Sequence, residues 1–80
     1  MFINKAPGNR NNLCGKNIAS IRRSMKLSQR ELADRFQLAG LEIDKNAVQR
    51  IESGQRFVTD IELKVFSKVL NKPLDELLEE

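Results

Sequence analysis

Four polar side chains that match nucleic-acid bases fall within one short stretch near the middle of the chain: Lys45, Asn46, Gln49 and Arg50. In a helix, successive residues turn by about 100°, so these four side chains share one face. Lysine and arginine match O6 and N7 of guanine, and asparagine and glutamine match N6 and N7 of adenine. An ordinary solvated face is the alternative, but such a face more often carries a glutamate, and none of the four is acidic. All four side chains could therefore reach base edges of double-stranded DNA, and this face is a candidate for base contact.

The opposite face of this helix, predicted over Lys45 to Glu52, carries apolar side chains: Ala47, Val48 and Ile51. Asp44 precedes the segment and is a favoured N-cap residue, with Ile43 and Val48 at the spacing of a hydrophobic staple. A helix this short is not stable alone. It must therefore be held by packing against other helices.

Two further helix starts carry a fuller signature. Ser28 is followed three residues later by Glu31, and Thr59 is followed by Glu62 at the same spacing. This is the spacing of the capping box, in which the two residues exchange hydrogen bonds with each other's backbone. Each cap is also flanked by the apolar pair of a hydrophobic staple: Leu27 with Leu32, and Val58 with Leu63. Helices are thus predicted to begin near residues 28, 44 and 59.

Apolar residues at helical spacing place the remaining elements. The first helix is indicated by Cys14, Ile18, Ile21 and Met25, and the second, which stops before Gly40, by Leu32, Ala33 and Phe36. The fourth ends around Asn71 and has the apolar residues Leu63, Phe66, Val69 and Leu70. A short fifth helix begins at Pro73, and its apolar stripe is Leu74, Leu77 and Leu78. No segment alternates long enough to be a strand, so the predicted fold class is all-α with five helices. Residues 1–11 carry Pro, Gly and three Asn without an apolar period and are predicted to form a flexible N-terminal arm. Residues 12–80 then form a single helical domain.

Charge is distributed unevenly along the chain. Residues 1–56 hold 11 Lys and Arg against 5 Asp and Glu, a net charge of +6, whereas residues 57–80 hold 3 against 6, a net charge of −3. The basic part contains the predicted base-reading helix, which suits a polyanionic partner.

Several classes of function are disfavoured by composition. The chain has no His and only one Cys, Cys14, so no metal site of ordinary ligand number, no intramolecular disulfide and no cofactor are expected. Cys14 lies at helical spacing with Ile18 and Ile21 and is interpreted as a core residue, which makes an enzyme improbable. Four Phe without Tyr or Trp give no stacking platform for single strands. No apolar run reaches the length of a membrane span, so a cytoplasmic location is expected.

The chain resembles the Cro and phage-repressor class of helix-turn-helix proteins, also called the xenobiotic-response-element family. Over residues 13–78, the resemblance depends on five short patterns in the right order: Ile21-Arg22, Leu27-Ser28-Gln29, Glu31-Leu32-Ala33, Ile51-Glu52-Ser53-Gly54 and Leu74-Asp75-Glu76-Leu77. It implies a five-helix, repressor-like DNA-binding domain. One departure is the connection over residues 39–44, which has six residues against the three or four usual for the motif. It contains Leu41 and Ile43 and is expected to be packed.

The resemblance also implies roles for individual residues. Lys45, Asn46, Gln49 and Arg50 fall on base-contacting positions, and Gln29, Gln55 and Arg56 fall on phosphate-contacting positions. Arg22 and Glu52 match a structural ion pair that joins the first helix to the third. Ser53 and Gly54 are interpreted as a helix C-terminal turn.

The predicted function is a sequence-specific transcriptional regulator, a repressor that acts by occupying a promoter. The alternatives are an antitoxin that represses its own operon and a helical protein-interaction module without DNA binding. One short helix reads few base pairs, so a homodimer on an inverted-repeat operator is expected. Its contact is placed at Leu74, Leu77 and Leu78, although these leucines could equally pack back onto the first helix. No ligand-sensing domain is expected, so a regulatory protein partner is a possible means of control.

Overall fold

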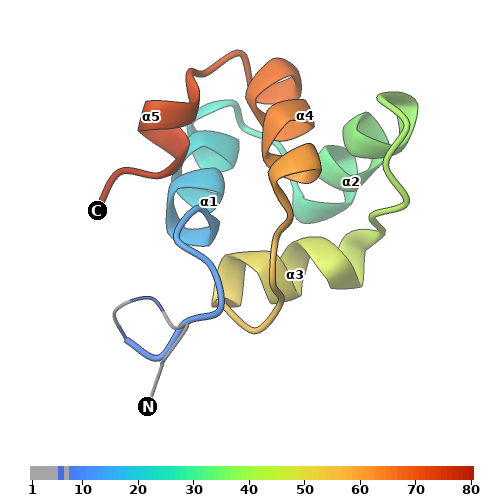
Figure 1. Cartoon of the computed structure of the whole chain (residues 1–80). Helices are drawn as coiled ribbons and strands as arrows, with labels where there is room; N and C mark the ends of the chain where they lie inside the picture. The colour runs from blue at the N-terminus through green and yellow to red at the C-terminus, as the bar shows by residue number, and fades with distance from the viewer. Residues whose placement is uncertain (1–5, 7) are drawn as a thin grey trace.

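The computed structural model describes residues 6 and 8–80, and this part of the chain folds into five helices without a strand, as the sequence predicted (Figure 1). The helices are α1 (Gly15–Ser24), α2 (Gln29–Leu38), α3 (Lys45–Ser53), α4 (Asp60–Leu70) and α5 (Leu74–Leu77). Helix α3 lies along one end of the molecule, beneath α1 and α2, and α5 lies beside α1 at the other end.

The helices begin where the sequence predicted. At α2, the Ser28 hydroxyl accepts a hydrogen bond from the Glu31 N–H at 3.0 Å, and the Glu31 carboxylate accepts one from the Ser28 N–H at 2.9 Å. Thr59 and Glu62 form the same capping box at α4. Asp44 accepts from the backbone N–H three residues later, at 2.8 Å, and caps α3. These bonds satisfy N–H groups that have no partner inside a helix.

The core lies where α1, α2 and α3 meet and continues between α2, α4 and α5. Phe36 and Phe66 stack near its centre with ring centroids 4.6 Å apart. The other fully buried side chains come from every helix and from the connection before α3: Cys14, Ile18, Leu32, Ile43, Val48, Ile51, Leu70 and Leu77. Cys14 is thus a core residue, as predicted, and burial raises its pKa to about 11.

The six-residue connection between α2 and α3 is packed, as expected from its apolar residues. Ile43 is buried in the core, and Leu41 is half-buried against it. The Gln37 side-chain amide donates to the Ile43 carbonyl at 3.2 Å. The second half of the longer connection is therefore held by the core. Helix α2 ends before Gly40, as predicted, and this glycine has a left-handed φ of +97°.

The C-terminal leucines do not share one exposed stripe. Leu77 is fully buried, whereas Leu74 and Leu78 remain 43% and 38% exposed. The Asn17 side chain donates to the carbonyls of Leu77 and Glu79, both at 2.8 Å, and ties the C-terminal segment to α1. The expectation that Leu77 contributes to a self-association surface is therefore wrong, because this side chain is needed to fill the core between α1 and α4.

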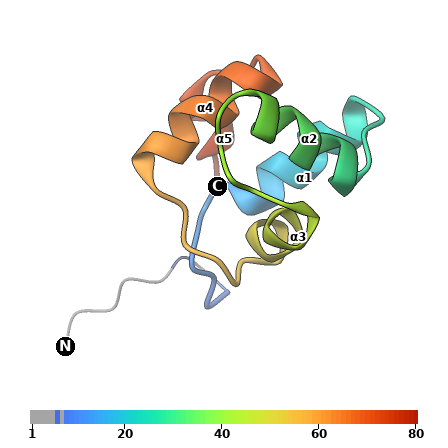
Figure 2. The ribbon, with the colours of Figure 1, turned by 90° about the vertical axis from the view of Figure 1, so that its right-hand side faces the viewer.

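The predicted N-terminal arm, residues 1–11, lies partly outside the described residues, which include only 6 and 8–11 of it. Ala6 and Arg10 form an isolated antiparallel bridge around a turn. Beyond this turn the chain meets the end of α3, where the Asn11 N–H donates to the Gly54 carbonyl at 2.8 Å. Figure 2 shows this segment running beside the loop that follows α3.

Candidate nucleic-acid interface

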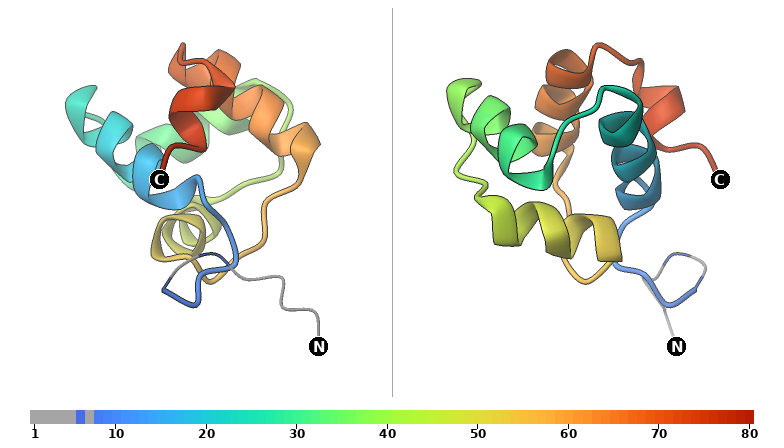
Figure 3. Two further views of the ribbon diagram at one scale, coloured as in Figure 1. Left: turned by 60° about the vertical axis from the view of Figure 1, so that its left-hand side comes forward. Right: turned by 180° about the vertical axis from the view of Figure 1, so that it is seen from behind.

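The outward face of α3 carries exposed polar side chains. Four exposed side chains of this face make no hydrogen bond or ion pair with any other described residue: Lys45, Asn46, Gln49 and Arg50. On the opposite side of the helix, Ala47, Val48 and Ile51 are buried against the core. Helix α3 packs against α1 and α2 and lies at the edge of the domain (Figure 3). The polar face, opposite these buried side chains, is therefore exposed to solvent. The donors and acceptors of this face are available for an external ligand.

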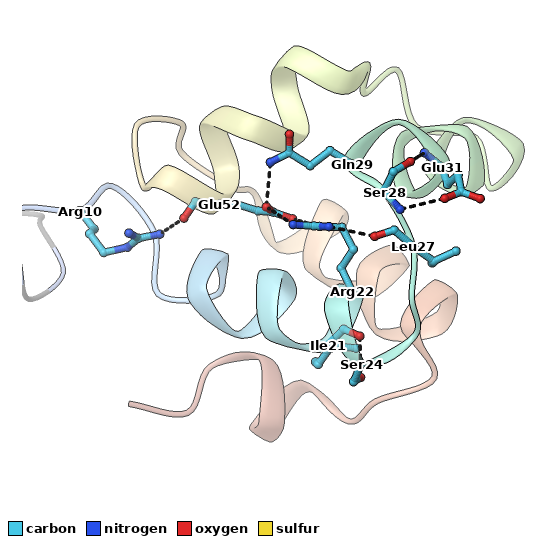
Figure 4. Close-up of polar contacts among 9 residues, drawn as sticks. All are labelled: Arg10, Ile21, Arg22, Ser24, Leu27, Ser28, Gln29, Glu31 and Glu52. Atoms are coloured by element: carbon cyan, nitrogen blue, oxygen red, sulfur yellow. Dashed lines mark hydrogen bonds and ion pairs between the residues drawn. The ribbon is translucent and has the colours of Figure 1, made fainter.

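An ion pair fixes the C-terminal half of α3 to α1. Arg22 donates from Nε to Glu52 Oε2 at 2.7 Å and from its NH2 group to Oε1 at 3.2 Å (Figure 4). Arg22 also donates to the carbonyl of Leu27, just before α2, at 2.8 Å. The pair therefore joins α1, α3 and the turn into α2, which sets the angle at which α3 is presented.

Gln29, at the start of α2, belongs to the same network. Its side-chain Nε2 donates to Glu52 Oε1 at 2.9 Å, and the side chain is half-buried. One amide hydrogen is thus used inside the protein, and an amide carries two. The Gln29 side chain thus joins the start of α2 to α3, and its second amide hydrogen has no partner among the described residues.

The loop after α3 holds the other two residues assigned to phosphate contact. Gly54 ends the helix with a left-handed φ of +86°, a conformation that favours glycine. Gln55 is exposed, whereas Arg56 is half-buried and donates to both oxygens of Glu62, at 2.9 and 3.2 Å. These bonds lower the pKa of the Glu62 carboxyl below its ordinary value. Arg56 is therefore already paired before any ligand arrives.

A model of the helix-turn-helix family matches residues 18–77. The chain belongs to the helix-turn-helix family. Its resemblance to the Cro and phage-repressor class is confirmed, and α2 and α3 are the two helices of the motif. The structure is also similar to the crystal structure of the restriction-modification controller protein C.AhdI from Aeromonas hydrophila, with 27% identity, a TM-score of 0.67, and 79% of this chain and 84% of that chain covered. Comparison with curated proteins gives no match.

Family and fold together indicate a helix-turn-helix DNA-binding regulator of transcription. None of the helices in residues 6 and 8–80 is long and apolar enough to cross a membrane.

Around the helix-turn-helix, Arg50 and Arg56 line the same shallow groove, of about 600 Å³, between the two connections that flank α3. Glu42 and Asp44 line it as well. The lining is therefore of mixed charge.

Sequence reasoning missed three residues beside the helix-turn-helix, because they fall within or next to the predicted arm. Arg10, Asn11 and Asn12 all donate hydrogen bonds to backbone carbonyls at the C-terminal end of α3 or in the loop after it. One signal was present in the sequence: Asn12 stands three residues before Gly15, and its side-chain oxygen accepts from the Gly15 N–H at 2.8 Å. Asparagine side chains commonly bond to nearby backbone N–H groups in this way.

Proposed function

We propose that this helix-turn-helix protein is a sequence-specific repressor that blocks transcription by occupying a promoter as a homodimer on an inverted-repeat operator. The observation that carries the proposal is the free polar face of α3, on which Lys45, Asn46, Gln49 and Arg50 have no partner among the described residues. These four residues contact bases. Since the ligand is genomic DNA, we place the protein in the cytoplasm.

Contacts to the DNA backbone complete the interface. Gln29 contacts a phosphate with the amide hydrogen that Glu52 leaves free, and Gln55 and Arg56 contact another from the loop after α3. Such contacts position a protein on the duplex, whereas base contacts select the sequence. The Arg22–Glu52 pair lies behind both sets and holds α3 in place.

A dimer follows from the length of the recognition helix. Helix α3 has nine residues, about 14 Å of helix, and therefore reads only a few base pairs. Two copies placed in successive major grooves require half-sites about 34 to 36 Å apart. With Leu77 buried, the large apolar side chains that remain exposed among the described residues lie before α1, at the end of α2, around the start of α4 and at α5: Leu13, Leu38, Phe57, Ile61, Leu74 and Leu78.

Selection of bound sequences from random duplex DNA tests the proposal. We expect enrichment of one inverted repeat, and we expect the protein placed on that repeat within a promoter to reduce transcription in vitro. Binding without enrichment of any sequence would contradict sequence-specific recognition. Enrichment with unchanged or increased transcription would leave recognition standing and reject the repressor role.

A second candidate function is control of a restriction-modification system. The likeness to the controller protein C.AhdI favours it. The distinguishing measurement is footprinting on the DNA that surrounds the gene of this protein. A protected site upstream of a restriction or modification gene supports this candidate, and protected sites only at unrelated promoters reject it.

A further inference from the structure

The segment before α1 binds the carbonyl end of the recognition helix. Arg10 donates from NH2 to the Glu52 carbonyl at 2.6 Å, and Asn12 donates from Nδ2 to the carbonyls of Ile51 and Arg56, at 3.0 and 2.7 Å. Asn11 lies between them and bonds the carbonyl of Gly54 through its N–H and that of Gln55 through its side chain, both at 2.8 Å. Three consecutive residues thus bind backbone carbonyls at the end of α3 and in the loop after it.

These bonds supply partners for carbonyl groups that lack a hydrogen-bond partner within the helix. The last four carbonyls of an α-helix have no partner within it. At the end of α3, the N–H groups of Gln55 and Arg56 both donate to the Arg50 carbonyl, at 2.9 and 3.2 Å. The Gly54 N–H donates to the Ile51 carbonyl. The carbonyls of Glu52 and Arg56 find their partners in Arg10 and Asn12, which lie more than 40 residues earlier in the chain.

Asn12 occupies the tightest part of this junction. Its side chain is buried, and it bridges the start of α1, the end of α3 and the loop through three hydrogen bonds. Gly15, at the start of α1, lies so close to the end of α3 that a β-carbon there would collide with the Ile51 carbonyl oxygen. The position of the loop relative to α3 is therefore set by Asn12, which binds the backbone carbonyl of Ile51 in α3 and that of Arg56 in the loop.

We propose that Asn12, assisted by Arg10, is a positioning residue for DNA binding: it fixes the loop that carries Gln55 and Arg56 so that the base-reading face of α3 and the phosphate contacts of the loop meet the duplex as one rigid unit. The inference rests on the proposed DNA-binding function. Its physical reason is preorganisation, since a loop that is already ordered does not lose conformational freedom on binding.

The chain offers a matched control for Asn12. Asn17 also lies in the α1 region and also donates Nδ2 bonds to two carbonyls, those of Leu77 and Glu79, but at the far end of the domain. N12A and N17A each remove one amide and two such bonds, and N12A also removes the bond that Asn12 accepts from the Gly15 N–H. Only N12A releases the loop after α3.

The experiment measures binding of a labelled selected duplex, and of a scrambled duplex of the same length, at a temperature where each variant is folded by circular dichroism. For N12A we expect about tenfold weaker binding to both duplexes, and for N17A we expect parental affinity. In an R56A background N12A should add little further loss, because it acts through the loop that carries Arg56. If N12A does not fold, R10A takes its place in the same measurements, because the Arg10 side chain is only half-buried.

The outcomes separate the two proposals. A parent protein that selects no DNA sequence rejects the proposed function and the inference with it. A parent that binds its selected site, with N12A and N17A equally close to parental affinity, rejects the inference alone. Full additivity of N12A and R56A would likewise show that Asn12 does not act through the loop.

Discussion

Arg22 on α1 and Glu52 on α3 form a two-point ion pair whose side chains are only 12% and 7% exposed. Glu52 is on the same helix as the predicted base contacts but on the inward side, where it also accepts from Gln29. The helix therefore combines an outer face with free donors and acceptors and an inner side that is fully committed to the fold.

Glu52→Ala should lower the melting temperature sharply, because it leaves Arg22 buried without its partner. Removing one member of a buried pair costs about 3 to 5 kcal/mol, a large share of the 5 to 15 kcal/mol typical of a domain. Thermal unfolding followed by circular dichroism measures the change. Ser53→Ala is the matched control, because this exposed neighbour bonds only within α3. Parental melting together with abolished DNA binding would instead place Glu52 at the interface.

Asn46→Ala and Gln49→Ala should each weaken binding to the selected site by about 1 to 3 kcal/mol and relax the preference at one base pair. Both side chains are exposed and have no described partner, so little change in melting temperature is expected. Titration against the selected site and its single-base variants measures both effects. Ser20→Ala, on the α5 side of α1, is the control. Parental affinity in both variants would contradict the assignment of this face.

Arg56→Ala should weaken binding to selected and scrambled DNA by similar factors and lower the dependence of log affinity on log salt by about one. Arg56 is a proposed phosphate contact, and a contact to phosphate does not distinguish one DNA sequence from another. A salt titration of both duplexes measures the slope. An unchanged slope would remove Arg56 from the contacts.

Glu62→Gln should strengthen binding to all duplexes by about two- to fivefold. The bound DNA backbone and the Glu62 carboxylate compete for the same guanidinium, and glutamine at this position still completes a capping box with Thr59. The gain should vanish in the double variant with Arg56→Ala. Weaker binding by Glu62→Gln alone would show that the ion pair helps to present Arg56.

The free energy of unfolding should decrease as the pH is lowered into the acid range. A hydrogen bond from the Arg56 side chain lowers the pKa of Glu62, and one from the Ser28 N–H lowers the pKa of Glu31, both from an ordinary 4.5. A lowered pKa in the folded state gives stability that is present above the unfolded value and is lost as the pH falls through the folded value. Urea unfolding between pH 6 and pH 3 should show this loss below about pH 4.5, with a smaller loss in Glu62→Gln. An equal loss in that variant would contradict the assignment to Glu62.

A duplex with one half-site scrambled should bind much more weakly than the intact inverted repeat, and the intact repeat should bind two protomers. Measurement of stoichiometry on DNA is needed because a weak dimer forms only on its site. Substitution of Ile61 on α4, Leu74 on α5 or Leu38 on α2 by lysine, one at a time, identifies which exposed apolar face is used. One protomer per duplex, with no loss on scrambling, would reject the dimer.

The sequence by itself determined the helices and the amphipathic character of α3. Ser28 with Glu31 and Thr59 with Glu62 are three residues apart, so each capping bond lies within one helical turn and needs no tertiary contact. Helical periodicity likewise separates the buried Val48 from the exposed Gln49. Whether the exposed residues contact bases remains a prediction.

Only the tertiary structure decided which polar groups are already occupied. Arg56 is paired with Glu62, Gln29 with Glu52, and the carbonyls at the end of α3 with Asn12. It also decided that Leu77 is buried while its neighbour Leu78 is not. The partners of Asn12 lie 39 and 44 residues away in the chain. Such contacts depend on how α1 packs across α3, which no local spacing specifies, because periodicity gives the face of a helix but not the element that meets it.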